Sequence, residues 1–304
     1  MIGVYAEPVA SVVVTRRLPH LFAALCLAAC TIAPATAAAQ GSPQQVYAIV
    51  VDSDGWPVRG LSAEDFSLRD GAVRQAVLSA EPATNPVWTA VVVRGFERGE
   101  LPAVRRAIEA LAKTTRTGAA GSRTGVMRAS SSGSSWTEVT ADMNDAAWNA
   151  LVANSAGSIV DAIGDACTAL RNAPTDRRAV VTILKRRPDD ASVKLTGLVT
   201  DTLFNAGAAL WTIEMPSSAG SPAPAPAAGS AKLDDVLNDA TKFSGALRER
   251  VNDAAELAPM AERVGHFLFV QYIVTYLWPN PMLSTFSIAT RHDRGEVLVP
   301  AWAR

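Results

Sequence analysis

Residues 87–98 of the chain have the sequence VWTAVVVRGFER, and this stretch sets the expected fold. Its first seven residues are apolar or β-branched without a break and lie between Pro86 and Gly95, which is typical of a strand buried on both faces of a sheet. Ligands of open α/β sheets bind just beyond the carboxyl ends of such strands. The residues there include Arg94 and Arg98 but no cluster of carboxylates or hydroxyls. This edge of the predicted sheet therefore lacks the usual oxygen ligands of a metal site.

The composition is that of a globular chain. It has 304 residues, of which 49% are hydrophobic and 19% charged, with room for one large domain or two small ones. The formal net charge of −1 leaves no basic footprint for nucleic acid or for an anionic membrane surface. We therefore expect no nucleic-acid partner.

Residues 1–39 are predicted to be an export signal. Arg16 and Arg17 precede the apolar run 21–33, and three alanines at 37–39 form a small-residue cleavage site. The apolar run is too short to span a bilayer, so we expect a periplasmic or secreted mature protein without a transmembrane segment. An alternative is a lipoprotein anchored through Cys30, because the sequence LAAC at 27–30 resembles a lipobox.

The predicted mature chain contains little of the chemistry that enzymes use. Cys167 is its only thiol, which precludes an internal disulfide, and its place on the apolar side of a predicted helix favours a core residue. Its histidines, His266 and His292, belong to no recognisable catalytic motif. The sequence has no nucleophile elbow, zincin helix, phosphate loop or Cys-x-x-Cys. We therefore expect a protein that is not an enzyme and that needs no cofactor.

Residues 40–85 are predicted to form a small β-rich leader. A strand at 46–51 is followed by the turn sequence DSDGWP at 52–57, and a hairpin covers 66–79. Asp52 and Asp54 have the spacing of a calcium loop but lack its later ligands, so a turn is favoured.

Residues 86–304 are predicted to form one α/β domain. Strands and helices alternate from residue 87 onward, which favours a doubly wound, mainly parallel sheet of the Rossmann-like kind. The segment 216–230 is a Pro/Ala-rich loop, and 130–135 a flexible run. The predicted strands are 124–129, 179–184, 208–215, 267–278, 282–289 and 297–299, and the predicted helices are 101–114, 144–154, 158–172, 193–206, 233–240 and 247–264.

In this order the elements resemble the von Willebrand factor A-type (VWFA) related proteins that are abundant in acidobacteria. The resemblance covers nearly the whole mature chain and is most specific in the leader. It rests on VDSDGWPVRGL at 51–61, DFSLRDG at 65–71, the strands 87–93 and 179–184, GSIVDAI at 157–163, DDAS at 189–192 and QYIVTY at 271–276.

The resemblance implies a metal-ion-dependent adhesion site that is degenerate here. In the family, an Asp-x-Ser-x-Ser loop after the first strand, a Thr from a second loop and an Asp after the fourth strand hold Mg²⁺. The loop positions correspond to Arg94, Phe96 and Arg98, the Thr to Ser158 and the late Asp to Arg186. Guanidinium groups repel a cation, so we interpret the metal site as lost.

Two interpretations of the basic residues remain open. Arg94, Arg98 and residues 185–187 could gather at one sheet edge and receive an acidic side chain of a partner protein, in place of the metal. The favoured interpretation is that they are surface charges paired with Glu97, Glu100 and the aspartates at 189 and 190.

The sequence therefore predicts an exported, non-enzymatic VWFA-like protein. Its expected role is protein–protein interaction or scaffolding in the cell envelope, independent of divalent metal. One alternative is an anion- or acidic-peptide-binding module that uses the basic cluster, with Arg94, Arg98, Ser158 and Arg186 as partner-binding residues. A second alternative is an exported hydrolase with carboxylate-based catalysis.

Overall fold

The computed structural model describes residues 42–130, 133–152, 158–185, 196–216, 228–278, 286–291 and 295–301. All of them belong to one compact unit, Gly41–Arg304. The predicted export signal, most of the Pro/Ala-rich loop, Arg186, Arg187 and His292 lie outside the described residues. Within the described ranges, no helix is both long and apolar enough to cross a membrane.

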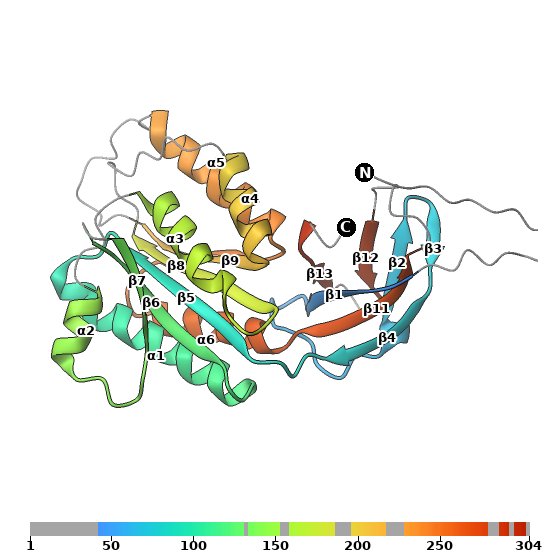
Figure 1. Ribbon diagram of the computed structural model, residues 1–304, viewed down its shortest axis with the longest axis horizontal. Coiled ribbons are helices and arrows are strands. Elements are labelled where there is room, and N and C mark those ends of the chain that lie inside the picture. Colours follow the sequence, from blue (N-terminus) through green and yellow to red (C-terminus); the bar gives the residue numbers. More distant parts are fainter. Residues whose placement is uncertain are drawn as a thin grey trace, which may run out of the picture. The chain divides into compact units, whose positions relative to one another are not determined.

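A six-stranded sheet forms the centre of the unit (Figure 1), in the order β10-β9-β8-β5-β6-β7. Every neighbouring pair is parallel except the hairpin β6–β7. This topology confirms the predicted doubly wound, mainly parallel fold class. The strands are β5 (Val87–Arg94), β6 (Arg123–Ser130), β7 (Gly133–Glu138), β8 (Arg177–Lys185), β9 (Ala208–Met215) and β10 (Arg248–Arg250).

Helices cover both faces of this sheet, as Figure 1 shows. Successive residues of a strand point to opposite faces, so Val181 and Ile183 of β8 join one core while Val180 and Leu184 join the other. The first core is closed by α1 (Leu101–Gly118), α2 (Asp145–Val152) and α6 (Leu257–Phe269). The second is closed by α3 (Ile159–Arg171), α4 (Thr196–Ala206) and α5 (Ala228–Phe243).

The β-rich part is built from both ends of the described chain. Its two sheets have the strand orders β13-β1-β11-β4 and β12-β2-β3. The C-terminal strands were predicted to belong to the second domain, but each pairs with a leader strand, since hydrogen bonding depends on position and not on sequence distance. The elements are β1 (Ser42–Val51), η1 (Ala63–Asp65), β2 (Phe66–Asp70), β3 (Val73–Gln75), β4 (Val77–Pro82), β11 (Tyr272–Trp278), β12 (Phe286–Thr290) and β13 (Glu296–Leu298).

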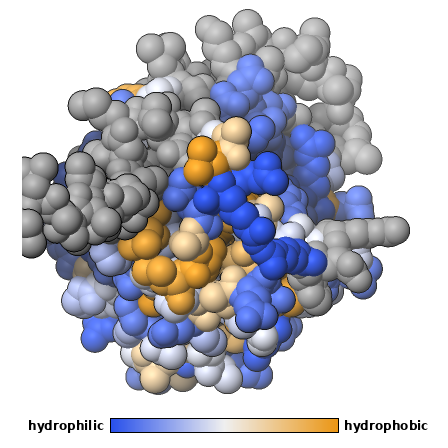
Figure 2. Space-filling model, turned by 90° about the vertical axis from the view of Figure 1, so that its right-hand side faces the viewer, coloured by the Kyte–Doolittle hydropathy of each residue, from blue (hydrophilic) through white to orange (hydrophobic). Residues whose placement is uncertain are grey.

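A third hydrophobic core lies inside this part and reaches its surface. Tyr272 and Val274 of β11 are buried in it with Phe66 and Leu68 of β2. Figure 2 views the molecule from the right-hand side of Figure 1 and shows hydrophobic residues gathered near the middle, with hydrophilic residues beside and below them. The partly buried hydrophobic residues that pack on the third core are Val58, Val77, Ala80 and Val297.

The predicted flexible run at 130–135 is wrong for the residues that the structure describes. Gly133 begins β7, which pairs antiparallel with β6. Serines and glycines are poor strand formers, but Trp136 stacks on Trp88 with ring centroids 5.5 Å apart. A Cβ on Gly125 would lie 2.2 Å from the Trp136 ring, so a glycine in β6 makes room for it. Tertiary packing thus holds a strand that local propensity does not predict.

Two C-terminal predictions are also wrong. Residues 248–250 form β10, not the start of a helix, and α6 begins only at Leu257. Residues 267–269 end that helix and are not part of a strand. A continuous apolar run cannot by itself distinguish a buried helix from a strand. Phe267 faces the central sheet, where its ring stacks on Trp211 with centroids 5.1 Å apart.

The turn at 52–57 packs on α6. The Asp52 carboxylate accepts hydrogen bonds from the backbone N–H groups of Asp54 and Trp56, at 3.0 and 2.8 Å, so the predicted turn is confirmed. Gly55 has φ +76°, and its carbonyl accepts from Arg263 Nε at 2.9 Å. A Cβ at Gly55 would lie 2.1 Å from that guanidinium. A side chain at this position would be strained at the positive φ and would displace the Arg263 guanidinium from the Gly55 carbonyl.

Candidate functional site

The carboxyl ends of the neighbouring strands β5 and β8 lie at the point where the strand order of the sheet reverses direction. From β5 the chain continues to β6 on one side, and later returns to β8 on the other. Such a switch point is the usual ligand site of open α/β sheets. Arg94 ends β5 in register with Leu184, and Lys185 follows as the last residue of β8.

Lys185 is the central charge at this switch point. Its side chain is 6% exposed, and Nζ lies 2.6 Å from Glu100 Oε1 and 4.0 Å from Glu97 Oε1. Glu100 ends the short helix η2 (Arg98–Glu100), and its other oxygen accepts from the Glu97 backbone N–H at 2.9 Å. The loop between β5 and α1 is therefore folded around the Lys185 ammonium group.

Gly95 lets this loop cross directly over the end of β8. Its φ is +89°, a conformation that glycine adopts without strain. A Cβ at this position would lie 2.1 Å from the Lys185 carbonyl oxygen. The glycine after the first strand thus allows Glu97 and Glu100 to approach Lys185.

The four residues predicted to bind a partner have different places. Arg94 is partly buried at the end of β5, and Arg98 is exposed at the start of η2. Ser158 caps α3, where its Oγ accepts from the Val160 backbone N–H at 3.2 Å. Because α3 runs back to the start of β8, Ser158 lies at the same sheet edge. Arg186 lies outside the described residues, so the convergence of all four remains a prediction.

Of the two open interpretations, Lys185 follows the favoured one, in which it pairs with acidic neighbours, but it is buried where a surface charge was expected. The side chain is buried against carboxylates, because a solvent-poor ammonium requires a counter-ion. The proposed pairing of Glu97 and Glu100 with basic neighbours is confirmed in this form, with Lys185 as the partner.

These residues do not fit a divalent cation. Mg²⁺ requires several oxygen ligands in octahedral geometry, but Lys185 Nζ already lies against the Glu100 carboxylate. A second cation at this point would face repulsion from the buried ammonium. Among the described residues, no group of three or more His, Cys, Asp or Glu side chains could hold a metal ion.

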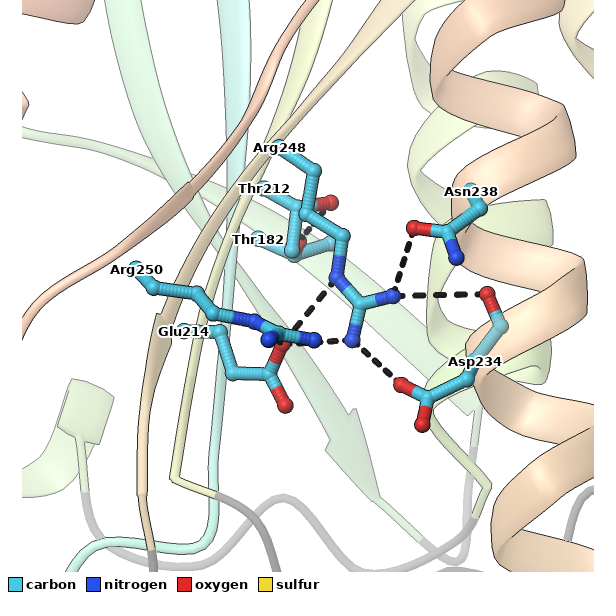
Figure 3. A network of polar contacts seen from close by, with 7 residues as sticks. All are labelled: Thr182, Thr212, Glu214, Asp234, Asn238, Arg248 and Arg250. Atoms are coloured by element: carbon cyan, nitrogen blue, oxygen red, sulfur yellow. Dashed lines mark hydrogen bonds and ion pairs between the residues drawn. The ribbon is translucent and has the colours of Figure 1, made fainter.

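A second buried ion network lies where β10 pairs with the carboxyl-terminal half of β9 (Figure 3). Arg248 Nε donates to Glu214 Oε2 at 3.0 Å, while Nη2 contacts both this oxygen and Asp234 Oδ1 of α5 at 2.5 Å. Nη1 donates to Asn238 Oδ1 at 2.7 Å. This network ties α5 to the sheet beside residues 248–250, which pair with β9 as a strand where a helix was predicted.

Sequence reasoning proposed that Glu97 and Glu100 pair with basic neighbours that include Lys185, but it did not predict that Lys185 is buried. The Glu97–Glu100 spacing is also a capping-box signal before α1, which indicates a folded loop. The Arg248 network was missed, because Arg248 becomes identifiable only once the strand register places it beside Glu214.

Comparisons with known proteins bear on the fold. No family model matches the sequence, and no curated protein matches it. Among solved structures, the chain is similar to the VWA domain of SpRpn10, with 11% identity, a TM-score of 0.41 and coverage of 58% of this chain and 95% of that one.

Two further solved structures give similar values. An aerotolerance-related membrane protein from Bacteroides fragilis NCTC 9343 has 13% identity and a TM-score of 0.39, over 58% of this chain and 97% of that one. The ArnB paralog VWA2 from Sulfolobus acidocaldarius has 10% identity and a TM-score of 0.40, over 86% of this chain and 71% of that one. At these identities, and with TM-scores below 0.5, the likeness carries no argument about family, activity or partners.

Proposed function

We propose that this protein is an exported, non-enzymatic A-type module that mediates protein–protein interaction or scaffolding in the cell envelope without a divalent metal. The observation that carries the proposal is the buried Lys185 ammonium against Glu100 and Glu97 at the switch point. Export rests on the predicted signal at residues 1–39.

The ion pair removes the chemistry of metal-dependent adhesion. In the domains that the sequence resembles, the metal keeps one coordination position open for a partner's carboxylate. Here the only buried cation described at this edge already has carboxylate partners from its own chain. A partner would therefore contact surface groups such as the exposed Arg98 and Glu97. Such contacts do not depend on a divalent ion, so a chelator should leave them intact.

Proximity labelling with the full chain in its native envelope tests the interaction. We expect the same labelled proteins with and without EDTA, and their loss when Arg94 and Arg98 are both changed to Glu. The matched control is Arg69→Glu with Arg74→Glu, on the exposed β2–β3 hairpin. Loss of labelling in EDTA, or equal loss in both double variants, would refute the proposal.

Thermal unfolding of the mature chain tests metal independence separately. A ligand that binds only the folded state raises the unfolding midpoint. We expect midpoints in Mg²⁺ and in EDTA to agree within about 1 °C. A midpoint that rises with Mg²⁺ concentration would show a metal site.

Broad hydrolase screening of the same preparation tests the proposal that the protein is not an enzyme. No turnover of any substrate is expected.

A further inference from the structure

A cavity of about 330 Å³ lies at the opposite edge of the central sheet, within the lower range of small-molecule sites. The first residues of β5, β8 and β9 form its floor, the end of α6 one wall, and β1 with β13 its cover. It is thus enclosed only because the β-rich part sits on this edge. Its apolar lining includes Ile49, Val87, Trp211 and Leu268.

The wall next to Arg177 is rigidly built. Arg177 is buried, with 3% of its surface exposed. It donates five hydrogen bonds, one to Gln271 Oε1 at 2.8 Å and the others to backbone carbonyl oxygens. These carbonyls belong to Ala83, Asn85, Leu268 and Phe269. A site whose walls are held in this way is largely pre-formed.

Two hydrogen-bond donors of cavity-lining residues are buried without a partner among the residues that the structure describes. One is the indole Nε1 of Trp211, a residue with no exposed surface, and the other is Nε of Arg178. Buried donors are nearly always satisfied, and each unmet one costs about 1–3 kcal/mol. Arg178 follows Arg177 in β8 and so points to the other face of the sheet from Trp211, where it donates to the carbonyls of Ala206 and Ala173. The indole N–H of Trp211 is therefore the donor that a ligand in this cavity would complete, and such a ligand must supply an acceptor.

The charges around the cavity favour an anion. The guanidinium groups of Arg177 and Arg178 donate to carbonyl and amide oxygens, and none of these acceptors within the described part of the chain is a carboxylate. Among the described residues that line the cavity, one carries a carboxylate, the exposed Asp176. Two guanidinium groups against one carboxylate leave a single net positive charge. Burial and Asp176 raise the pKa of the lining residue Tyr47, so this phenol stays neutral.

We propose that this cavity binds a small apolar monocarboxylate. Its hydrocarbon body packs against Val87, Leu268 and the Trp211 ring, and its carboxylate accepts from the indole N–H. The anion also balances the charge of the two arginines. This site is separate from the switch point and does not depend on the proposed partner binding.

Titration of the ¹⁵N-labelled mature chain with phenylacetate tests the site. We expect a saturable shift of the Trp211 indole N–H signal, which Trp211→Phe identifies by its loss. The neutral analogue phenylacetamide should bind at least about ten-fold more weakly, because it cannot balance the guanidinium charge. Ala209→Met, which fills the cavity from its lining, should abolish the shift. The matched control is Ala162→Met on α3, a partly buried alanine outside the lining.

Three results would overturn the proposal. The first is no indole shift with phenylacetate up to about 10 mM, a concentration that would detect even weak binding. The second is equal affinity for the amide, which would leave a neutral ligand site or a water-filled cavity. The third is equal behaviour of the two methionine variants. If Ala209→Met does not fold, Trp211→Phe decides the point, because it keeps the stacked ring but should weaken phenylacetate binding about ten-fold, as measured by calorimetry.

Discussion

A single strand, β8, carries a buried cation at each end, and the two cations are held in different ways. Arg177 at its start and Lys185 at its end are 3% and 5% exposed. Arg177 donates to four carbonyls and one amide oxygen, whereas Lys185 lies against the carboxylates of Glu100 and Glu97. One end of the strand therefore joins segments of backbone, and the other neutralises charge.

The chemistry of the two side chains explains this difference. A guanidinium is a planar fork with five donors, so it can bond several separate carbonyls at once. An ammonium is a compact point charge, which is best stabilised by a carboxylate. Without a carboxylate partner, burial lowers the pKa of Arg177 to about 10. The arginine thus connects β8 to α6 and to the residues before β5, while the lysine closes a loop.

The largest effect is expected at the arginine. Arg177→Met should lower the free energy of unfolding by roughly 3–5 kcal/mol, because two buried and two partly buried carbonyls lose their donor. Urea unfolding monitored by circular dichroism measures this change. Arg123→Met is the control, since the Arg123 side chain is 50% exposed and lies over Trp88. Equal losses in the two variants would show that the five hydrogen bonds contribute little.

At the other end of β8, Lys185→Met should lower the free energy of unfolding by about 1–3 kcal/mol, since Glu100 then loses the Lys185 ammonium. The loss is smaller because Glu100 is 22% exposed and water can solvate it in part. Adding Glu100→Gln should recover part of the loss, which a double-mutant cycle measures. Additive effects of the two substitutions would contradict direct pairing.

Cys167 of α3 contrasts with these two cations, because it is a buried titratable group that is neutral. It has no exposed surface, which confirms the prediction of a core residue. Burial raises the pKa of its thiol from 9.0 to about 12. Its stabilising contribution is therefore complete below about pH 9 and is lost as the pH rises toward 12, by up to about 1.4 kcal/mol per pH unit.

Unfolding of wild type and Cys167→Ala at about pH 8 and pH 10 measures this contribution. The alanine variant keeps every other titrating group, so the stability difference between the two proteins should shrink at the higher pH. A difference that does not change with pH would mean that the thiol is accessible to solvent.

The smallest effect is expected for Glu97→Gln. Its carboxylate is 72% exposed and lies 4.0 Å from Lys185 Nζ, so the loss should be below about 0.5 kcal/mol. It should disappear at high salt, because ions screen exposed pairs. A loss as large as that of Lys185→Met would show that Glu97, rather than Glu100, neutralises the lysine.

Much of the central fold could be predicted from local pattern. The strands 87–93, 179–184 and 208–215 each lie within or coincide with an observed strand, because buried parallel strands are continuously apolar. The helix pattern that begins at residue 101 marks the observed start of α1. The N-terminal turn followed from aspartate and glycine chemistry. These signals are local, so sequence alone carries them.

Other elements depend on distant partners and were missed. β7 requires Trp136 on Trp88, and β10 requires Arg248 between Glu214 and Asp234. The cavity needs leader and C-terminal strands on the same sheet edge. None of these contacts leaves a periodic trace in the sequence.

The sequence by itself determined the α/β alternation, the buried strands and the presence of Arg, Phe and Arg at 94, 96 and 98 in place of carboxylates or hydroxyls, because these follow from residue types at known places. Only the tertiary structure decided what stands at the switch point instead. Strand register brings Lys185 to the end of β8, and the positive φ of Gly95 brings Glu100 over it. Which charges pair is a matter of distance in space, and the order of residues along the chain does not contain that distance.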